Sequence, residues 1–217
     1  MADFTIYIAN KNYSSWSLRA WLMLKQTGAE FAETLIPLRE ATTRANILRH
    51  SPSGRVPALH HGDLVIWDSL AIGEYLAELF PAARLWPEDM QARAVARSAS
   101  AEMHSGFAAL RSHLPMNMRS SFPHRGVTQE AQADINRITA LWRDCRKRFG
   151  GEGEFLFGHF TIADAMYAPV VSRFRTYKVE LEPETQLYAD TVWALPSVQE
   201  WLTEARNEPM IIEDSEF

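Results

Sequence analysis

Three serines stand close together near the start of the chain, at Ser14, Ser15 and Ser17. A β-branched and aromatic run precedes them at 4–9, and apolar residues at helical spacing follow over about 15–27, so a strand here turns into a helix. The free N–H groups and the positive dipole end of such a helix start attract anions. One serine would suffice as an N-cap. Three hydroxyls therefore indicate a bound group that they hold.

Two further pairs could hold the rest of such a group. Val56-Pro57 leads directly into a short strand, where a cis bond would turn the backbone of Val56 outward to pair with an extended peptide. Asp68-Ser69 opens a helix directly after a strand and could accept an ammonium group and donate to a carboxylate. A trans proline at a strand start and simple helix capping are the alternatives. Together the three features predict a short, anionic, peptide-like ligand with its reactive end at Ser14.

Four segments of this chain resemble the cytosolic glutathione transferase family. They read Tyr-Ser-Ser-Trp-Ser-Leu-Arg from Tyr13, Ser-Gly-Arg-Val-Pro-Ala-Leu from Ser53, Asp-Ser-Leu-Ala-Ile-Gly-Glu-Tyr-Leu from Asp68 and Phe-Thr-Ile-Ala-Asp-Ala from Phe160. The serine pattern is most similar to serine-type members, the zeta class in particular. Trp16 and Asp68 depart from that class, which usually carries Cys and Gln there. The resemblance implies a thioredoxin-like α/β domain followed by an all-α helical bundle domain, with glutathione as co-substrate.

The resemblance also implies how glutathione is activated. Ser14 would donate a hydrogen bond to the glutathione sulfur, with Ser15 as the second candidate for this catalytic role. A free thiol has a pKa near ~8.5, and a hydrogen bond to the thiolate together with the helix N-terminus would lower it by roughly one to two units. Tyr7 and Tyr13 are rivals, because other classes use a tyrosine. Both rank below Ser14, since Tyr7 lies inside the strand and Tyr13 lies just before the turn. Ser17 and Arg19 are expected to be structural.

The binding roles follow in the same way. Val56 would pair its backbone with the cysteinyl part of glutathione, while Asp68 and Ser69 would hold the γ-glutamyl end. Arg55, Arg39 and His50 are all candidates for the glycine carboxylate. The predicted glutathione-binding set is Ser14, Arg55, Val56, Pro57, Asp68 and Ser69.

The second substrate would bind between the two domains. Adaptable apolar side chains suit varied electrophiles, and membership of the helix core is the alternative for each of them. The predicted hydrophobic site consists of Trp16, Met103, Phe107 and Met116, with Met118 as a further candidate. By location alone, polar contacts could come from Glu102, His104 and Arg111.

Composition excludes several other classes. Of the 217 residues 47% are hydrophobic and 23% charged, and a net charge of −5 argues against a nucleic-acid surface. A single cysteine, Cys145, excludes an intrachain disulfide, so we expect the protein to reside in a reducing compartment. Cys145 lies on an apolar helical stripe, which predicts that its side chain is part of the core. No signal peptide and no membrane span are recognised, which predicts a cytoplasmic protein. Adjacent histidines at His60 and His61 lack zinc-ligand spacing, so no metal is predicted.

The order of elements predicts two domains. Patterns over 1–80 read βαβ-α-ββα, with strands at 4–9, 31–38, 56–59 and 64–67 and helices at 15–27, 40–49 and 70–79. A proline-bounded linker at 81–87 precedes an all-helical domain at 88–217. Four helices are expected in that domain. The first covers 88 to about 119, and the second carries an apolar stripe from Ile135 to Phe149. The third begins at a capping box formed by Thr161 and Asp164, and the fourth covers 196–205.

These observations leave three functions open. The first is a glutathione transferase, a homodimer that conjugates glutathione to small hydrophobic electrophiles in detoxification. The second is a glutathione-dependent cis–trans isomerase resembling maleylacetoacetate isomerase. The third is a non-catalytic glutathione-binding scaffold, because one fold can serve several functions.

Overall fold

The first part of the chain forms a small mixed sheet with three helices. The computed structural model describes residues 3–216. The sheet has the order β2-β1-β3-β4, with β1 and β2 parallel and the other neighbours antiparallel. This confirms the predicted βαβ-α-ββα order. The elements are β1 (Phe4–Ile8), α1 (Ser15–Gln26), β2 (Phe31–Leu35), α2 (Thr43–Leu48), β3 (Ala58–His61), β4 (Leu64–Trp67) and α3 (Ser69–Leu79).

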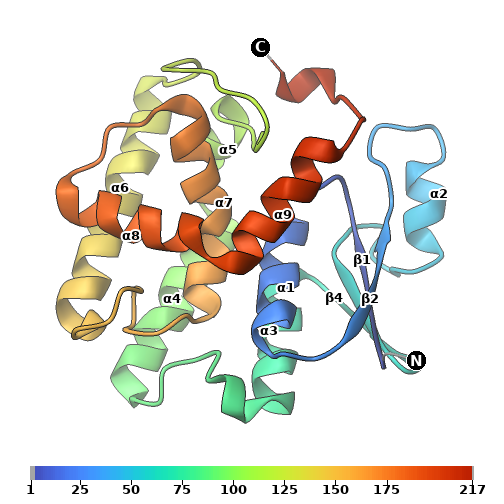
Figure 1. The fold of residues 1–217 in the computed structure, drawn as a ribbon, viewed down its shortest axis with the longest axis horizontal. Coiled ribbons are helices and arrows are strands. Elements are labelled where there is room, and N and C mark those ends of the chain that lie inside the picture. Colours follow the sequence, from blue (N-terminus) through green and yellow to red (C-terminus); the bar gives the residue numbers. More distant parts are fainter. Residues whose placement is uncertain (1–2, 217) are drawn as a thin grey trace.

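The second part consists of helices, as the fold prediction requires. Figure 1 shows the sheet and α2 on one side and α4 to α8 on the other, with α1, α3 and α9 between them. The predicted limits 1–80, 81–87 and 88–217 stay a prediction, and residues 1–2 and 217 lie outside the described part. The elements are η1 (Pro81–Ala83), α4 (Met90–Ser105), α5 (Ala108–His113), α6 (Gln129–Cys145), η2 (Arg146–Gly150), α7 (Ile162–Tyr177), α8 (Pro183–Ala194), α9 (Pro196–Asn207) and η3 (Glu213–Ser215).

The prediction of one helix from 88 to about 119 is wrong. Helix α4 ends at Ser105, and α5 runs only from Ala108 to His113. The break lies at Gly106 and Phe107, where Phe107 adopts a left-handed φ of +57° that no helix can continue through. Helix α8 lies in a stretch where the sequence analysis predicted no element.

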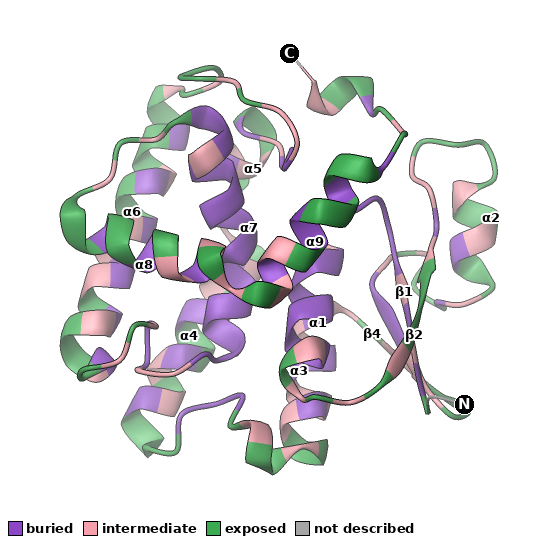
Figure 2. Cartoon of the chain, viewed as in Figure 1, coloured by how far each residue is buried: buried purple, intermediate pink, exposed green. Residues whose placement is uncertain are grey.

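The core continues from the sheet into the helices without interruption. Helix α1 packs against both α3 and α7, and α7 is buried along nearly its whole length (Figure 2). Cys145 is 1% exposed, and burial raises the pKa of its thiol to about 12. The predicted core position of this cysteine is thereby confirmed. No described helix is long and apolar enough to cross a membrane.

The end of the chain holds the loop that precedes α1. The carboxylate of Glu208 accepts hydrogen bonds from the Asn10 side chain and from the Asn12 N–H at 3.0 Å. The Arg119 guanidinium donates to the Glu208 carbonyl at 2.8 Å. Because this loop leads directly into Ser14, the C-terminal segment helps to fix the position of that serine.

Candidate active site

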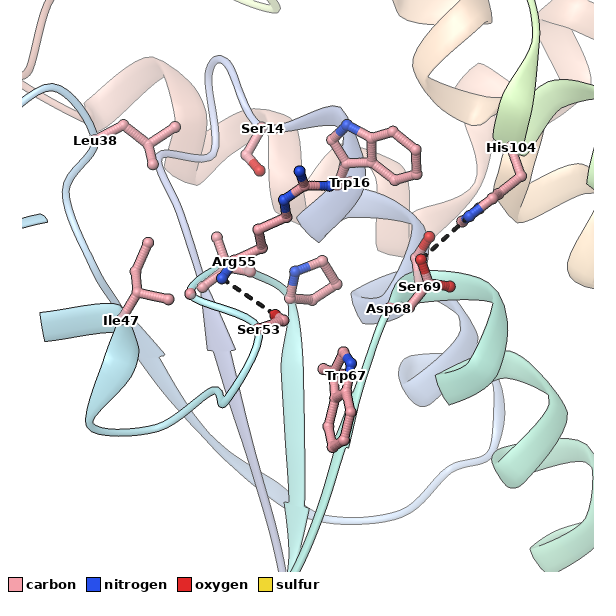
Figure 3. Close-up of a pocket in the computed structure, with 13 residues that line it drawn as sticks. Ser14, Trp16, Leu38, Ile47, Ser53, Arg55, Trp67, Asp68, Ser69 and His104 are labelled. Atoms are coloured by element: carbon pink, nitrogen blue, oxygen red, sulfur yellow. Dashed lines mark hydrogen bonds and ion pairs between the residues drawn. The ribbon is translucent and has the colours of Figure 1, made fainter. Parts of the chain in front are cut away.

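One cavity of about 770 Å³ brings together the residues predicted to bind a ligand (Figure 3). All six members of the predicted glutathione-binding set line it. They come from the start of α1, the loop before β3 and the junction of β4 with α3. The complete lining is Ser14, Trp16, Leu38, Ile47, Ser53, Gly54, Arg55, Val56, Pro57, Trp67, Asp68, Ser69 and His104.

Ser14 is the N-cap of α1 and lies on the cavity wall. Its Oγ accepts the Ser17 N–H at 3.3 Å and donates to Ser17 Oγ at 2.8 Å, which in turn accepts the Ala9 N–H at 3.0 Å. These contacts hold the hydroxyl at the positive end of α1. A ligand atom in the cavity could receive the Ser14 proton if Ser17 then donated to Ser14 Oγ. Ser15 does not line the cavity, although it is the first residue of α1.

Val56 lies just beyond the paired part of β3. The Val56–Pro57 bond is cis. Pairing of β3 with β1 and with β4 begins at Ala58, which faces Tyr7 on one side and Trp67 on the other. The Val56 backbone therefore borders the cavity outside the ladder, where an extended ligand could pair with it.

The Asp68-Ser69 pair offers a carboxylate and a hydroxyl to the cavity. Asp68 adopts φ +76° and caps α3, because its Oδ1 accepts the N–H groups of Leu70 at 2.9 Å and Ala71 at 3.3 Å. Its Oδ2 lies 3.1 Å from His104 Nε2. Ser69 Oγ is buried and has no hydrogen-bond partner among the described residues. A buried hydroxyl is normally paired, so a ligand carboxylate fits this position.

Only one of the three candidates for the glycine carboxylate lines the cavity. Arg55 is exposed, and its backbone N–H is held by Ser53 Oγ at 3.2 Å (Figure 3). Arg39 instead pairs with Asp214 at 2.9 Å on the surface. His50 stacks on Tyr7 with ring centroids 4.1 Å apart. Geometry therefore favours Arg55 for a ligand carboxylate at this end.

Both rival tyrosines have their side chains engaged elsewhere. The ring of Tyr7 stacks on His50, outside the cavity lining. The Tyr13 hydroxyl donates to Glu216 Oε1 at 2.7 Å and accepts from Arg119 at 2.9 Å. Burial and the Glu216 hydrogen bond raise the pKa of Tyr13, so this phenol stays protonated and directed at the C-terminal segment.

We expect the Tyr13→Phe variant to conjugate glutathione at nearly the rate of the unmodified protein. The substitution removes a hydroxyl that points at Glu216 and leaves Ser14 and the cavity lining in place. The rate of glutathione conjugation at pH 7 should change by less than about threefold. The free energy of unfolding should fall by about 1–2 kcal/mol for the two lost hydrogen bonds. Steady-state kinetics and urea unfolding measure the two effects. A loss as large as that of a Ser14 variant would contradict the assignment of Ser14.

The predicted hydrophobic site is only partly assembled at this cavity. Trp16 lines it, with the guanidinium groups of Arg19 and Arg111 lying 4.7 Å and 4.9 Å from its ring centroid. The other predicted members lie in the hydrophobic core, because the apolar stripe of α4, the turn after it and the segment that follows α5 all face inward. These core residues are Met103 (0% exposed), Phe107 (8%) and Met116 (2%). Their role in binding an electrophile stays a prediction.

The sequence analysis assigned no binding role to five of the cavity residues and left a sixth undecided. These five are Leu38, Ile47, Ser53, Gly54 and Trp67. Trp67 directly precedes the Asp68-Ser69 pair, so its position in the sequence could have indicated it. His104 was named only as a polar neighbour by location. Arg19, expected to be structural, is fully buried, and no described residue hydrogen-bonds its guanidinium nitrogens.

Comparisons with known proteins agree with this architecture. The family model "Glutathione S-transferase, N-terminal domain" matches residues 13–79, and "Glutathione S-transferase, C-terminal domain" matches residues 92–204. Maleylacetoacetate isomerase of Mus musculus is 30% identical over 185 residues, which cover 82% of this chain and 81% of the mouse protein. Glutathione S-transferase 1 of Dianthus caryophyllus is 40% identical over 90 residues, 42% of this chain and 40% of the carnation protein.

A solved structure extends the likeness to the whole fold. A glutathione transferase homologue from Burkholderia with bound glutathione superposes with a TM-score of 0.73 at 26% identity, covering 94% of this chain and 99% of that one. The two family models together span most of the chain, and the helical one alone covers more than half of it. The chain therefore belongs to the glutathione S-transferase family.

Proposed function

We propose that this chain is a glutathione transferase that uses Ser14 to keep bound glutathione as a thiolate. The observation that carries the proposal is one cavity in which Ser14, Val56 and the Asp68-Ser69 pair all face the same space. A hydroxyl donor and the start of α1 both stabilise negative charge at the sulfur. No general base is needed, because the protein produces the nucleophile by stabilising it.

The cavity supports a definite orientation of glutathione. Ser69 Oγ, which has no hydrogen-bond partner in the described part of the chain, suits the γ-glutamyl carboxylate, and Asp68 suits the neighbouring ammonium group. Val56 would pair with the cysteinyl backbone, which brings the sulfur toward Ser14. Arg55 would meet the glycine carboxylate. Ser15 remains the second candidate at the sulfur.

In the transferase reaction the thiolate sulfur attacks an electrophilic carbon, forms a C–S bond and displaces a leaving group or adds across a double bond. Family membership supports small hydrophobic electrophiles as the second substrates, and these would bind beside Trp16. It also supports a cytoplasmic homodimer with a role in detoxification. The second candidate function, glutathione-dependent isomerisation, has support in the 30% identity to the mouse maleylacetoacetate isomerase. In that reaction the thiolate adds and later leaves, so free glutathione is recovered.

Ultraviolet titration of the thiolate in the presence of the protein tests the proposal. We expect bound glutathione to ionise about one to two pH units below the free thiol. A scaffold would bind glutathione and leave its pKa unchanged, and absence of binding would end the proposal. Product analysis then separates the reactions, since a stable thioether indicates transfer and recovered glutathione indicates isomerisation.

A further inference from the structure

The side chain of His104 reaches the cavity from α4, in the helical part of the chain. Among the described residues that line the cavity it is the one contributed by α4, and the others lie between positions 14 and 69. Its Nε2 lies 3.1 Å from Asp68 Oδ2 (Figure 3). A carboxylate can only accept, so Nε2 carries the proton of this contact. The imidazole also meets the Trp16 ring edge-on, at 83° and 5.1 Å between centroids.

This contact decides which atoms of Asp68 remain for a ligand. Oδ1 already accepts two backbone N–H groups as the cap of α3. Oδ2 lies 3.1 Å from His104 Nε2 and retains room for a further donor, because each carboxylate oxygen can accept about two hydrogen bonds. A ligand ammonium group must therefore approach Oδ2 beside His104. The cap and the imidazole together fix the plane of the carboxylate before the ligand arrives.

Pre-organised acceptors bind a cation more tightly than mobile ones, since less conformational entropy is lost on binding. The imidazole is itself held by the edge of Trp16, and its Nδ1 is buried without a partner among the described residues. Among the described residues, Asp68 is the polar group that contacts this imidazole. The imidazole of His104 is therefore placed where it can orient Asp68 Oδ2.

We propose that His104 is a positioning residue of the glutathione site, which acts through Asp68 to select ligands that carry the γ-glutamyl α-ammonium group. The inference rests on the proposed function and extends it to a residue and a selectivity. It predicts that the loss of His104 weakens recognition of that ammonium group and leaves recognition of the rest of the tripeptide intact.

Calorimetric binding of two ligands tests this selectivity. One ligand is glutathione and the other is glutaryl-cysteinylglycine, which lacks only the α-amino group. We expect His104→Ala to weaken glutathione binding by about fivefold to tenfold and binding of the analogue by less than about twofold. His104→Gln, whose amide can still donate to Oδ2, should recover much of the lost affinity. His113→Ala, an exposed histidine on α5, is the matched control and should leave both affinities unchanged.

A double-mutant cycle with Asp68→Asn tests the path of the effect. If His104 acts through Asp68, His104→Ala should add less than about twofold in the Asp68→Asn background. Equal weakening of both ligands, or full effects of His104→Ala in that background, would show a structural role and overturn the inference. Unchanged glutathione affinity of His104→Ala would overturn it as well. Failure of the unmodified protein to bind glutathione would instead refute the proposed function.

Discussion

Replacing Ser14 by alanine should raise the pKa of cavity-bound glutathione by about one unit and lower conjugation at pH 7 by about fivefold. By the proposed function the Ser14 hydroxyl, which lines the cavity as the N-cap of α1, would supply a hydrogen bond to the thiolate, and alanine cannot supply one. The positive end of α1 would remain. We therefore expect partial and not complete loss of thiolate stabilisation.

Ser14 also has a structural role that must be separated from the chemical one. It caps α1, and loss of a serine cap costs about 1 kcal/mol of stability. A cap defect lowers activity equally at all pH values. Loss of thiolate stabilisation is instead compensated above about pH 9, where the thiol ionises unaided. The pH profile of kcat/KM for Ser14→Ala should therefore rise toward that of the unmodified enzyme in alkali.

Ser15→Ala is the matched comparison for this experiment. Its hydroxyl is one residue away, at the first position of α1, and does not line the cavity. We expect its thiolate titration to match that of the unmodified protein. If Ser15→Ala raised the pKa of bound glutathione and Ser14→Ala did not, the catalytic role would pass to Ser15.

The sheet and the residue pairs that line the cavity could be predicted from sequence because their signals are local. A strand, a serine cluster and a helix follow one another within the first 26 residues. The part of the chain that contains the sheet ends with the β3–β4 hairpin and with α3, which Asp68 caps. Each signal concerns neighbouring residues, and the right-handed parallel crossover leaves few ways to combine them. The cavity then brings together residues that were identified separately.

The helical part was less predictable because its decisive features involve partners far apart in sequence. Apolar spacing places Met103 on a buried stripe, but it cannot tell a core neighbour from a substrate. The end of α4 depends on the left-handed backbone of Phe107, a conformation unusual for this residue type. His104 and Asp68 meet across 36 positions, which no short-range pattern reveals.

The largest effect on folding should come from Asp164, which opens α7. Its side chain is fully buried and accepts four hydrogen bonds. The donors are the Thr161 N–H at 2.8 Å, the Thr161 hydroxyl at 2.9 Å, the Tyr188 hydroxyl at 3.1 Å and the Leu156 N–H at 3.2 Å. The first of these bonds completes the predicted capping box.

Asp164→Ala should destabilise the fold by roughly 3–5 kcal/mol, measured by urea unfolding. The two hydroxyls can turn to other acceptors, but the two backbone N–H groups cannot and would stay buried and unpaired. A loss below about 1 kcal/mol would show that water satisfies these groups. Asp164→Asn is the milder comparison, because its amide oxygen keeps two of the donors while its NH₂ faces the Thr161 N–H.

The same pair of proteins reveals the cost of the buried charge. Burial raises the pKa of Asp164 to about 6, against the opposing effect of its hydrogen bonds. In the unfolded chain an aspartate titrates near ~4. Between pH 4 and pH 6 the folded state binds a proton at Asp164 that the unfolded state has released. Protonation of Asp164 therefore stabilises the fold in acid. This contribution to the free energy of unfolding, about 3 kcal/mol in total, is lost as the pH rises through 6. Asparagine does not titrate. The stability difference between the unmodified protein and Asp164→Asn should therefore shrink from pH 4 to pH 7, and a flat difference would show that the carboxylate is ionised throughout.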